Sequence, residues 1–543
     1  MSDIQEYDLL IVGAGFAGIH QLLNTRKLGL TAKILEEGDG LGGNWNWTRY
    51  PGARTDSEVP VYQFSNPELW KDWTFTEVFP DWKEYQAYFS YVDQKMDVSR
   101  DVFFNSRVVS AHWDNSAERW TVSTANGLIM RSQFFILCTG KTSAFHTPDF
   151  KGLDTFKGEM YHTSRWPAEY DLKGKKVGVI GTGASGVQVI QTVAPIVSHL
   201  TVFQRTPNYA LPMRQQPLSV EEVEKAKKDL YPVIFSRRMQ TFSGCYYDVI
   251  HKPIADTTPE ERALALEDLW ASKGLRFWLG TYAELWSNQE FNDEVYTFWR
   301  KKVLERIGPD PVLQEKLAPL KPPHPFGVRR ASLEQGYFEV FSCPNVTLVD
   351  VNEAAIEEIL PNGIRTSDGV EHALDVLVLA TGFDMLSGPI IAIDIRGQDG
   401  VSIKEKWTDG IQSYLGLASA TYPNMFWIYG PQSPSSLSIG PTASEFGSHW
   451  ITECIKYMKQ NHFSSIVATE DAQRAYSEHV DKLGAAGLWL GAKTSPYMGT
   501  NIPGKKAQMM QFPGGFPAYV KLCNDSAAKG YNGFKFNKQS SSA

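Results

Sequence analysis

Short apolar runs separated by glycine turns open the chain. Residues 7–12 form the first run and predict a buried strand of a parallel sheet, because such strands are covered on both faces. The glycine pattern of residues 13–18 and a helical pattern follow, and a second apolar run at residues 31–36 ends in Glu36. A strand, spaced glycines, a helix, a strand and a terminal acid in this order predict a βαβ dinucleotide-binding unit.

The three glycines of this unit, Gly13, Gly15 and Gly18, have separate roles. The first makes the tight turn, the second lets a pyrophosphate approach the backbone, and the third lets the helix pack closely on the strand. Glu36 accepts from a ribose 2′-hydroxyl and repels a 2′-phosphate, so we expect FAD or NAD here rather than NADP. The plainer alternative is a glycine-rich turn followed by a surface glutamate.

A second unit of the same design begins with the apolar run at residues 176–180. Its glycine pattern spans residues 181–186, and its second strand, residues 200–204, ends at Arg205. A guanidinium matches a 2′-phosphate in charge and in bidentate geometry, so this unit is expected to select NADPH. Thr206 adds a hydroxyl group, and an exposed arginine without a ligand is the alternative.

Further apolar runs predict the remaining strands. Residues 134–140 and 376–382 each end in Thr-Gly, which marks a strand followed by a turn. Residues 102–109 and 120–123 give weaker strand patterns, and residues 425–430 give another strand.

A Glu- and Lys-rich helical pattern runs from residue 219 to residue 314 and begins with a capping box at Ser219 and Glu222. Glycine and proline in residues 42–56 predict a loop without a regular helix, and residues 538–543 predict a disordered tail. The fold class is therefore α/β: two Rossmann-like dinucleotide-binding domains, with a helical insertion in the second.

The composition limits the number of domains and the kinds of partner that the protein can have. The chain has 543 residues, 42% hydrophobic and 21% charged, which indicates a globular protein of two or three domains. The net charge is 53 − 61 = −8, so no nucleic-acid partner is expected. The five cysteines form no C-x-x-C pair, and neither a metal site nor a signal peptide nor a membrane span is predicted. We expect a cytoplasmic protein, either a monomer or a small homo-oligomer.

An aromatic stretch between the two units carries a second kind of signal. Phe156-x-Gly158-x-x-x-His162-x-x-x-Trp166-Pro167 resembles the linker fingerprint of the type I Baeyer–Villiger monooxygenases, and residues 42–56 resemble their second fingerprint. The match is closest to the cyclohexanone monooxygenase group. The aromatic residues predict packing between domains, and His162 is interpreted as structural because the sequence offers it no acidic partner.

The resemblance implies an activity. NADPH reduces FAD, and one atom of O2 is inserted next to the carbonyl of a small-molecule ketone through a C4a-peroxyflavin, giving an ester or lactone, with sulfoxidation as a side activity. Arg330 and Asp56 are the implied catalytic residues, and Arg329 contacts NADPH. Read alone, Asp56 is an ordinary turn or cap residue, and the paired arginines are exposed cations.

The remaining implied sites are sets of residues. The candidate cofactor-binding residues are Gly13, Gly15, Phe16, Gly18, Glu36, Gly43, Trp45, Arg54, Thr55, Asp56, Tyr62, Thr182, Gly183, Ser185, Gly186, Gln188, Arg205, Thr206 and Arg329. The candidate substrate-pocket residues are Ser435, Ser436 and Leu437. In the implied mobile loop, residues 493–507, Pro496 replaces the tryptophan of the family pattern, and Tyr497 is the nearest aromatic residue.

The resemblance also implies a division of the chain. We expect the FAD-binding domain at 1–145 and 385–543, the NADP-binding domain at 146–215 and 326–384, and the helical insertion at 216–325.

Three rival functions remain. An N- or S-oxygenating flavin monooxygenase shares both nucleotide units but needs no cation for an oxyanion. A flavin disulfide reductase needs a close cysteine pair, which the sequence lacks. A non-enzymatic nucleotide sensor would bind both cofactors without turnover.

Overall fold

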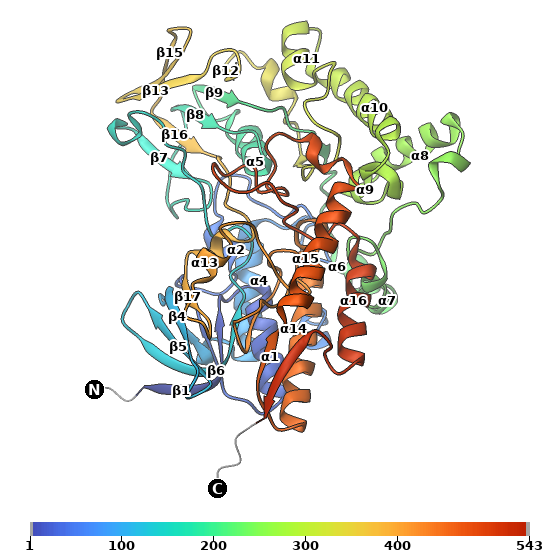
Figure 1. Ribbon diagram of the computed structural model, residues 1–543. Coiled ribbons are helices and arrows are strands. Elements are labelled where there is room, and N and C mark those ends of the chain that lie inside the picture. Colours follow the sequence, from blue (N-terminus) through green and yellow to red (C-terminus); the bar gives the residue numbers. More distant parts are fainter. Residues whose placement is uncertain (1–3, 539–543) are drawn as a thin grey trace.

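The computed structural model describes residues 4–538 and contains two large sheets, each with one glycine turn at the end of an inner strand (Figure 1). The first sheet has eight strands in the order β17-β4-β5-β6-β1-β2-β3, and β18 pairs with β6. Its strands are β1 (Gln5–Val12), β2 (Ala32–Leu35), β3 (Val102–Phe103), β4 (Val108–Asp114), β5 (Arg119–Thr124), β6 (Ile129–Leu137), β17 (Asp394–Arg396) and β18 (Met425–Trp427). Strands from both ends of the chain therefore share this sheet.

The second sheet has five strands, all parallel, in the order β12-β9-β8-β16-β7. They are β7 (Glu159–His162), β8 (Lys176–Ile180), β9 (His199–Gln204), β12 (Val346–Asp350) and β16 (Val376–Leu379). The edge strand β7 comes from the aromatic stretch and pairs His162 with Leu379. The segment expected to be a linker is thus partly a strand of this sheet, because its backbone completes the edge beside β16.

Helices cover these sheets and build the insertion. The first unit has α1 (Phe16–Lys27), which packs against α14 (Gly440–Gln460), and the second has α5 (Ala184–Val193). The insertion contains α6 (Val220–Asp229), α7 (Tyr231–Arg237), α8 (Pro259–Ala271), α9 (Arg276–Leu279), α10 (Gln289–Ile307) and α11 (Pro311–Leu317). The capping box is confirmed, since Ser219 Oγ accepts from the Glu222 amide at 3.2 Å and Glu222 accepts from the Ser219 amide at 3.1 Å.

Smaller elements complete the fold. The helices are α2 (Asn44–Trp47), α3 (Pro67–Trp70), α4 (Trp82–Met96), α12 (Gly388–Ile391), α13 (Ile403–Lys406), α15 (Glu470–Ala485) and α16 (Phe516–Ala528). The strands are β10 (Leu211–Pro212), β11 (Leu333–Glu334), β13 (Ile356–Leu360), β14 (Gly363–Thr366), β15 (Glu371–Ala373), β19 (Phe463–Ala468) and β20 (Phe534–Lys538). Within residues 4–538 no helix is long and apolar enough to cross a membrane.

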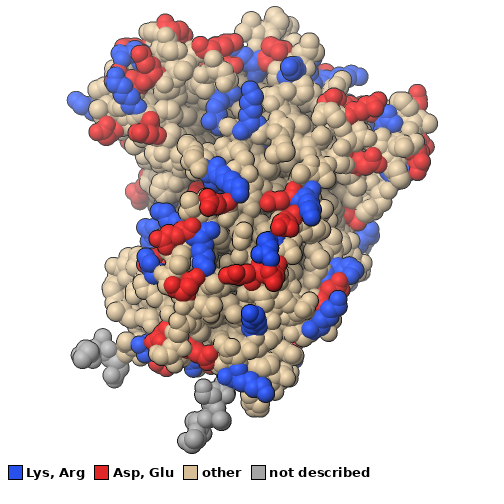
Figure 2. All heavy atoms as spheres, in the orientation of Figure 1, with Lys and Arg blue, Asp and Glu red and all other residues tan. Residues whose placement is uncertain are grey.

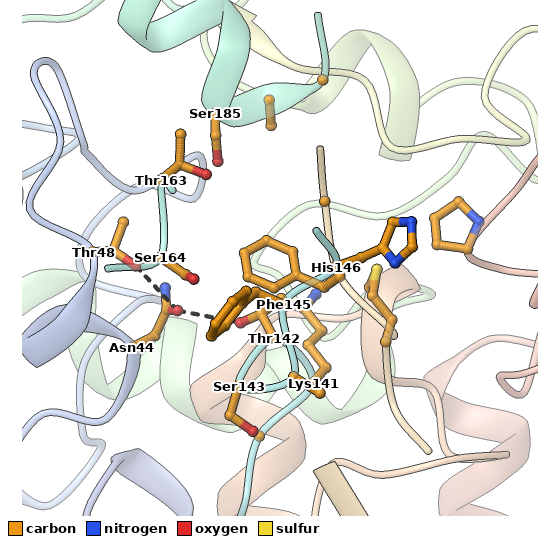
Figure 3. A pocket seen from close by; sticks show the side chains of 18 of the residues that line it. Asn44, Thr48, Lys141, Thr142, Ser143, Phe145, His146, Thr163, Ser164 and Ser185 are labelled. Atoms are coloured by element: carbon orange, nitrogen blue, oxygen red, sulfur yellow. Dashed lines mark hydrogen bonds between the residues drawn. The ribbon is translucent and has the colours of Figure 1, made fainter. Parts of the chain in front are cut away.

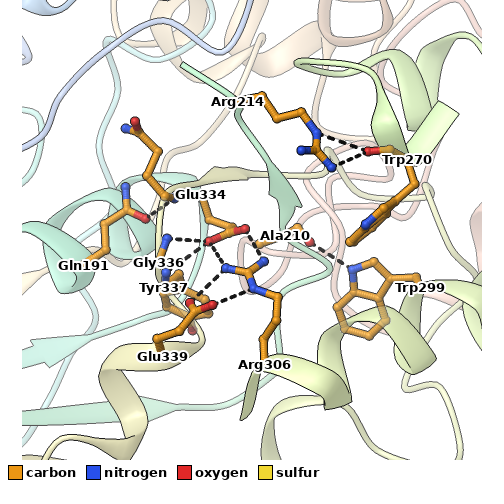
Figure 4. A network of polar contacts seen from close by, with 11 residues as sticks. Gln191, Ala210, Arg214, Trp270, Trp299, Arg306, Glu334, Gly336, Tyr337 and Glu339 are labelled. Carbon is orange, nitrogen blue, oxygen red and sulfur yellow. Dashed lines mark hydrogen bonds and ion pairs between the residues drawn. The ribbon is translucent and has the colours of Figure 1, made fainter. Parts of the chain in front are cut away.

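A polar network ties the insertion to the second unit (Figure 4). Arg306 of α10 donates to both carboxylate oxygens of the buried Glu334, at 2.6 and 2.9 Å, and also pairs with Glu339 at 2.6 Å. Trp299 of the same helix donates to the Ala210 carbonyl at 2.9 Å. Because Glu334 lies four residues after Arg330, this network also fixes the segment that carries the paired arginines.

Two local predictions were wrong, and a third was wrong at its first residue. The predicted strand at 102–109 is interrupted, because Asn105 adopts a left-handed conformation with φ of 52° between β3 and β4. The loop at 42–56 contains one helical turn, α2, in a stretch free of glycine and proline. Of the predicted tail at 538–543, Lys538 belongs to β20 and residues 539–543 lie outside the described residues.

Candidate active site

One cavity of about 1610 Å³ is lined by both glycine turns and by the segments that cross between the two sheets. Pockets for drug-sized ligands typically measure roughly 300–1,000 Å³, so this cavity has room for more than one such molecule. Figure 3 shows Lys141, Phe145 and His146 on one wall, with Thr163 and Ser185 across the cavity.

The first glycine turn is tightly packed. Gly13 has φ of +100°, and an added Cβ there would lie 2.6 Å from the Cys138 carbonyl oxygen. A Cβ on Gly18 would lie 1.9 Å from the Gly13 carbonyl oxygen, so only glycine lets the helix start this close to the turn. Gly13, Gly15 and Phe16 line the cavity, whereas Gly18 packs behind it.

Glu36 follows β2 directly and lies beside this turn, as expected from the βαβ pattern. Its carboxylate accepts from the amides of Ala14 at 2.6 Å and Gly38 at 2.8 Å, and it lines the cavity. Burial raises the pKa of Glu36, while these two hydrogen bonds act in the opposite direction. The carboxylate is thus held in place at the cavity wall.

The second glycine turn repeats the geometry of the first. Gly181 has φ of +104°, and a Cβ on Gly186 would lie 2.2 Å from the Gly181 carbonyl oxygen. Thr182 lines the cavity and donates to the Thr206 carbonyl at 2.9 Å. The other candidate residues of this unit that line the cavity are Gly183, Ser185, Gln188, Arg205 and Thr206, while Gly186 packs behind it.

Two cations of this unit face the cavity. Arg205 is exposed, and its guanidinium has no hydrogen-bond or ion-pair partner among residues 4–538. Arg329 donates to the carbonyl and hydroxyl oxygens of Thr494, and its Nε is buried without a partner. Burial, together with the charge of Arg205, lowers the pKa of Arg329 to about 10. Both guanidinium groups line the same cavity.

The predicted catalytic residues meet at the cavity wall, although 274 positions separate them. Arg330 donates from Nε to Asp56 Oδ2 at 2.5 Å and from Nη2 to Oδ1 at 2.8 Å, and its Nη1 donates to the Ser436 carbonyl at 2.9 Å. Burial disfavours the charge of Asp56, but Arg330 outweighs burial and holds the pKa of this carboxyl below its usual range. Burial likewise opposes the charge of Arg330, and Asp56 raises its pKa above the ordinary value.

The second fingerprint joins the two units beside this pair. Tyr50 donates to Gln188 Oε1 at 2.8 Å, and Gln188 Nε2 donates to the Arg54 carbonyl at 3.1 Å. Trp45 stacks on Tyr85 with ring centroids 4.5 Å apart. The candidate residues Gly43, Trp45, Arg54, Thr55, Asp56 and Tyr62 all line the cavity.

The defined residues of the linker fingerprint lie next to the cavity without lining it. His162 packs on Phe145 and Phe383, with ring centroids 4.9 and 5.9 Å away. Burial lowers its pKa to about 4, so this histidine is neutral at pH 7, in agreement with a structural role. None of the described residues Phe156, Gly158, His162, Trp166 and Pro167 lines the cavity.

Several lining residues were missed by sequence reasoning. Thr163, Ser164 and Arg165 line the cavity from the variable positions of that fingerprint, and Lys141 lines it directly after the first Thr-Gly turn. The Thr-Gly turn itself was the available signal, because residues after it leave the carboxyl end of a parallel strand, where ligands of such sheets bind.

The predicted substrate residues divide. All three are buried, and of the three only Ser436 lines the cavity. Pro496 and Tyr497 of the predicted mobile loop also line it. This loop contacts the segment after β16, since Asn501 donates to the Phe383 carbonyl at 2.9 Å and Lys505 pairs with Asp384.

Comparisons with known proteins agree with this geometry. Residues 7–215 match the family described as flavin-binding monooxygenase-like. A cyclopentanone 1,2-monooxygenase from Comamonas sp. is 44% identical over 528 residues, 97% of this chain and 95% of that protein. A closed crystal structure of cyclohexanone monooxygenase matches with a TM-score of 0.94 at 35% identity, covering 99% of this chain and 100% of that one. A complex of OTEMO with FAD and NADP matches with a TM-score of 0.92 at 35% identity, covering 98% and 99%.

The chain therefore belongs to the Baeyer–Villiger monooxygenases, the flavin-dependent oxidoreductases that use FAD and NADPH. The predicted fold class, with two Rossmann-type units, is confirmed. The cavity fits both cofactors. Each glycine turn leaves its backbone open for a pyrophosphate, and Arg329 of the second unit has an Nε that finds no partner among the described residues and is free to donate to a phosphate.

Proposed function

We propose that this enzyme converts small ketones, with cyclopentanone as the first candidate, to esters or lactones. The bidentate Arg330–Asp56 pair at the cavity wall carries the proposal, because it places a permanent cation in the cavity that both glycine turns line. Regiochemistry and the preferred ring size depend on the shape of the same wall.

The two charged residues have complementary tasks. When bound, NADPH supplies hydride to FAD, and reduced FAD activates O2 for transfer to the ketone. Arg330 stays protonated, so it stabilises negative charge on oxygen without giving up a proton. Asp56 uses both oxygens to orient the guanidinium, and its lowered pKa keeps it ionised at neutral pH.

We assign the cofactors to the two units by charge. The buried Glu36 carboxylate is suited to a ribose hydroxyl of FAD, and Arg205 with Thr206 and Arg329 is suited to the 2′-phosphate of NADPH. The sheet order supports the proposed division into an FAD domain (1–145, 385–543) and an NADP domain (146–215, 326–384), because β17 and β18 lie in the sheet of β1 while β12 and β16 lie in that of β8.

We also propose a cytoplasmic location. All five cysteines are free and four are buried, which is typical of proteins in a reducing compartment. On the face shown in Figure 2, Lys and Arg are interspersed with Asp and Glu, which supports a small-molecule partner rather than a nucleic acid.

The decisive experiment supplies FAD-loaded enzyme with NADPH, air and a mixed panel of ketones and sulfides, with product analysis by mass spectrometry. Esters or lactones are expected from the ketones. Sulfoxides without any ester would move the function to the heteroatom-oxygenating alternative, and consumption of NADPH with no oxygenated product would contradict the proposal.

A variant tests the role of the cation. Arg330→Ala is expected to lower ester formation at least about 100-fold while flavin reduction by NADPH partly survives, because the lost donor acts on developing oxyanions. Flavin content and thermal unfolding are measured alongside, since Asp56 loses its partner. The exposed Arg474→Ala serves as the matched control. Normal ester yield from Arg330→Ala would remove Arg330 from the chemistry.

A further inference from the structure

Lys141 places an amine in the cavity beside the catalytic pair. It follows β6 and the Thr-Gly turn, lines the cavity, and is half-buried (Figure 3). Its Nζ lies 5.3 Å from the ring centroid of Tyr429, and the charges of both Arg330 and Asp56 act on it. The amine therefore belongs to the part of the cavity where the catalytic pair lies.

This amine has no anionic partner among residues 4–538. Its side chain makes neither a hydrogen bond nor an ion pair there, and only its backbone carbonyl accepts, from the Leu386 amide at 3.3 Å. Asp56 already accepts from Arg330 with both oxygens and from Ser57 Oγ at 3.2 Å. An ammonium withdrawn from water without a partner is costly, so a bound molecule is the natural source of the missing acceptor.

We propose that Lys141 determines specificity by binding an anionic group, such as a carboxylate, on the ketone substrate. Keto acids then form a preferred substrate class, held by Lys141 at the anion while the carbonyl lies toward Arg330. The inference rests on the proposed ketone oxygenation and narrows it. Tyr429 shields the ammonium and adds a weak cation–π contact.

The protonation state of Lys141 gives the proposal a pH signature. Burial and the charge of Arg330 lower its pKa to about 7, with the charge of Asp56 acting in the opposite direction. The charged form exists below this pKa, so affinity for a carboxylate should fall as the pH rises through about 7. Asp56 and Arg330 stay ionised across this range, because one pKa is lowered and the other raised, and burial raises the pKa of Tyr429, which stays neutral.

The test measures binding to oxidised, FAD-loaded enzyme from flavin difference spectra, with 3-oxocyclopentane-1-carboxylate and its methyl ester as probes. Lys141→Met keeps the apolar stem and should weaken binding of the carboxylate about 10- to 100-fold, with little change for the ester. Lys141→Arg should restore binding and abolish its pH dependence, because a guanidinium stays charged. Lys228→Met, an exposed lysine on α6, is the control.

Three outcomes would overturn the inference. The first is that Lys141→Met weakens the binding of both probes equally, and the second is that the wild-type enzyme binds the ester more tightly than the acid. The third is that Lys141→Met changes only the flavin reduction potential or the affinity for NADPH, which would place the amine at a cofactor instead. Turnover of the methyl ester to a lactone distinguishes a failure of the proposed role of Lys141 from a failure of the proposed ketone oxygenation. If the ester is oxygenated and the acid shows no dependence on Lys141, only this inference fails; if no ketone is oxygenated, the proposed function fails first.

Discussion

The two glycine-turn units have nearly the same backbone and opposite chemistry at one position. In both, the third glycine lies against the carbonyl of the first, with an added Cβ 1.9 Å from that oxygen in one unit and 2.2 Å in the other. After the second strand, however, the first unit has the buried Glu36, fixed by two amides. The second has the exposed Arg205, whose guanidinium has no partner in the described part of the chain. On the proposed assignment, the shared turn determines where a dinucleotide lies, and the residue at the strand end determines which one is accepted.

The largest expected effect comes from disrupting the glycine turn that the two units share. Gly18→Ala should abolish FAD binding and destabilise the protein, whereas Gly186→Ala should abolish NADPH binding and leave some FAD bound. In each case the added Cβ meets backbone, and such overpacking costs about 1–3 kcal/mol. Flavin absorbance, NADPH titration and denaturant unfolding measure these effects.

Matched controls sharpen that prediction. A Cβ on Gly15 would come no closer than 3.5 Å to a neighbouring atom outside the turn, and one on Gly183 meets none within 4 Å. Gly15→Ala and Gly183→Ala should therefore leave the free energy of unfolding unchanged and weaken only the binding of the nucleotide. If Gly18→Ala binds FAD as the wild type does, the packing argument is wrong.

An intermediate effect is expected from changing the residue after the second strand, where the two units differ. Arg205→Gln should raise the KM for NADPH about 10- to 100-fold and change that for NADH little, because only NADPH carries the 2′-phosphate. Arg205→Lys should retain part of the preference, since the charge stays but the fork geometry is lost. Equal effects on both coenzymes would contradict the assignment.

The sequence predicted both units because their signals are local: a strand, three glycines and a helix lie within one short segment. Arg330 and Asp56 lie 274 positions apart in the chain, and their catalytic roles were predicted only through the resemblance to a family. The edge strand β7 escaped prediction, since its pairing with β16 depends on residues more than two hundred positions away.

The sequence does not show which side chains face the cavity, and this limited the prediction of the remaining site residues. Ser435, Ser436 and Leu437 lie in one short 3-10 turn, and only Ser436 faces the cavity. Likewise, nothing near Lys141 in the chain indicates that its amine lies beside Tyr429, because that contact forms only when the two ends of the chain share one sheet.

The smallest effect concerns the loop that covers the second unit. Lys505 pairs with Asp384, and the two side chains are 18% and 23% exposed. Lys505→Met should weaken NADP+ binding only about fivefold, measured by titration. The neighbouring Lys506→Met, whose amine instead donates to the Asp409 carbonyl, is the control. An identical loss in both variants would exclude the Lys505 contact as its cause.

The most direct test of the division between the two units is a crystal structure of the enzyme with FAD and NADP+ bound. We predict the FAD ribose within hydrogen-bond distance of Glu36 and the 2′-phosphate of NADP+ on the guanidinium of Arg205. A 2′-phosphate bound away from Arg205, or FAD in the turn of residues 181–186, would contradict the account.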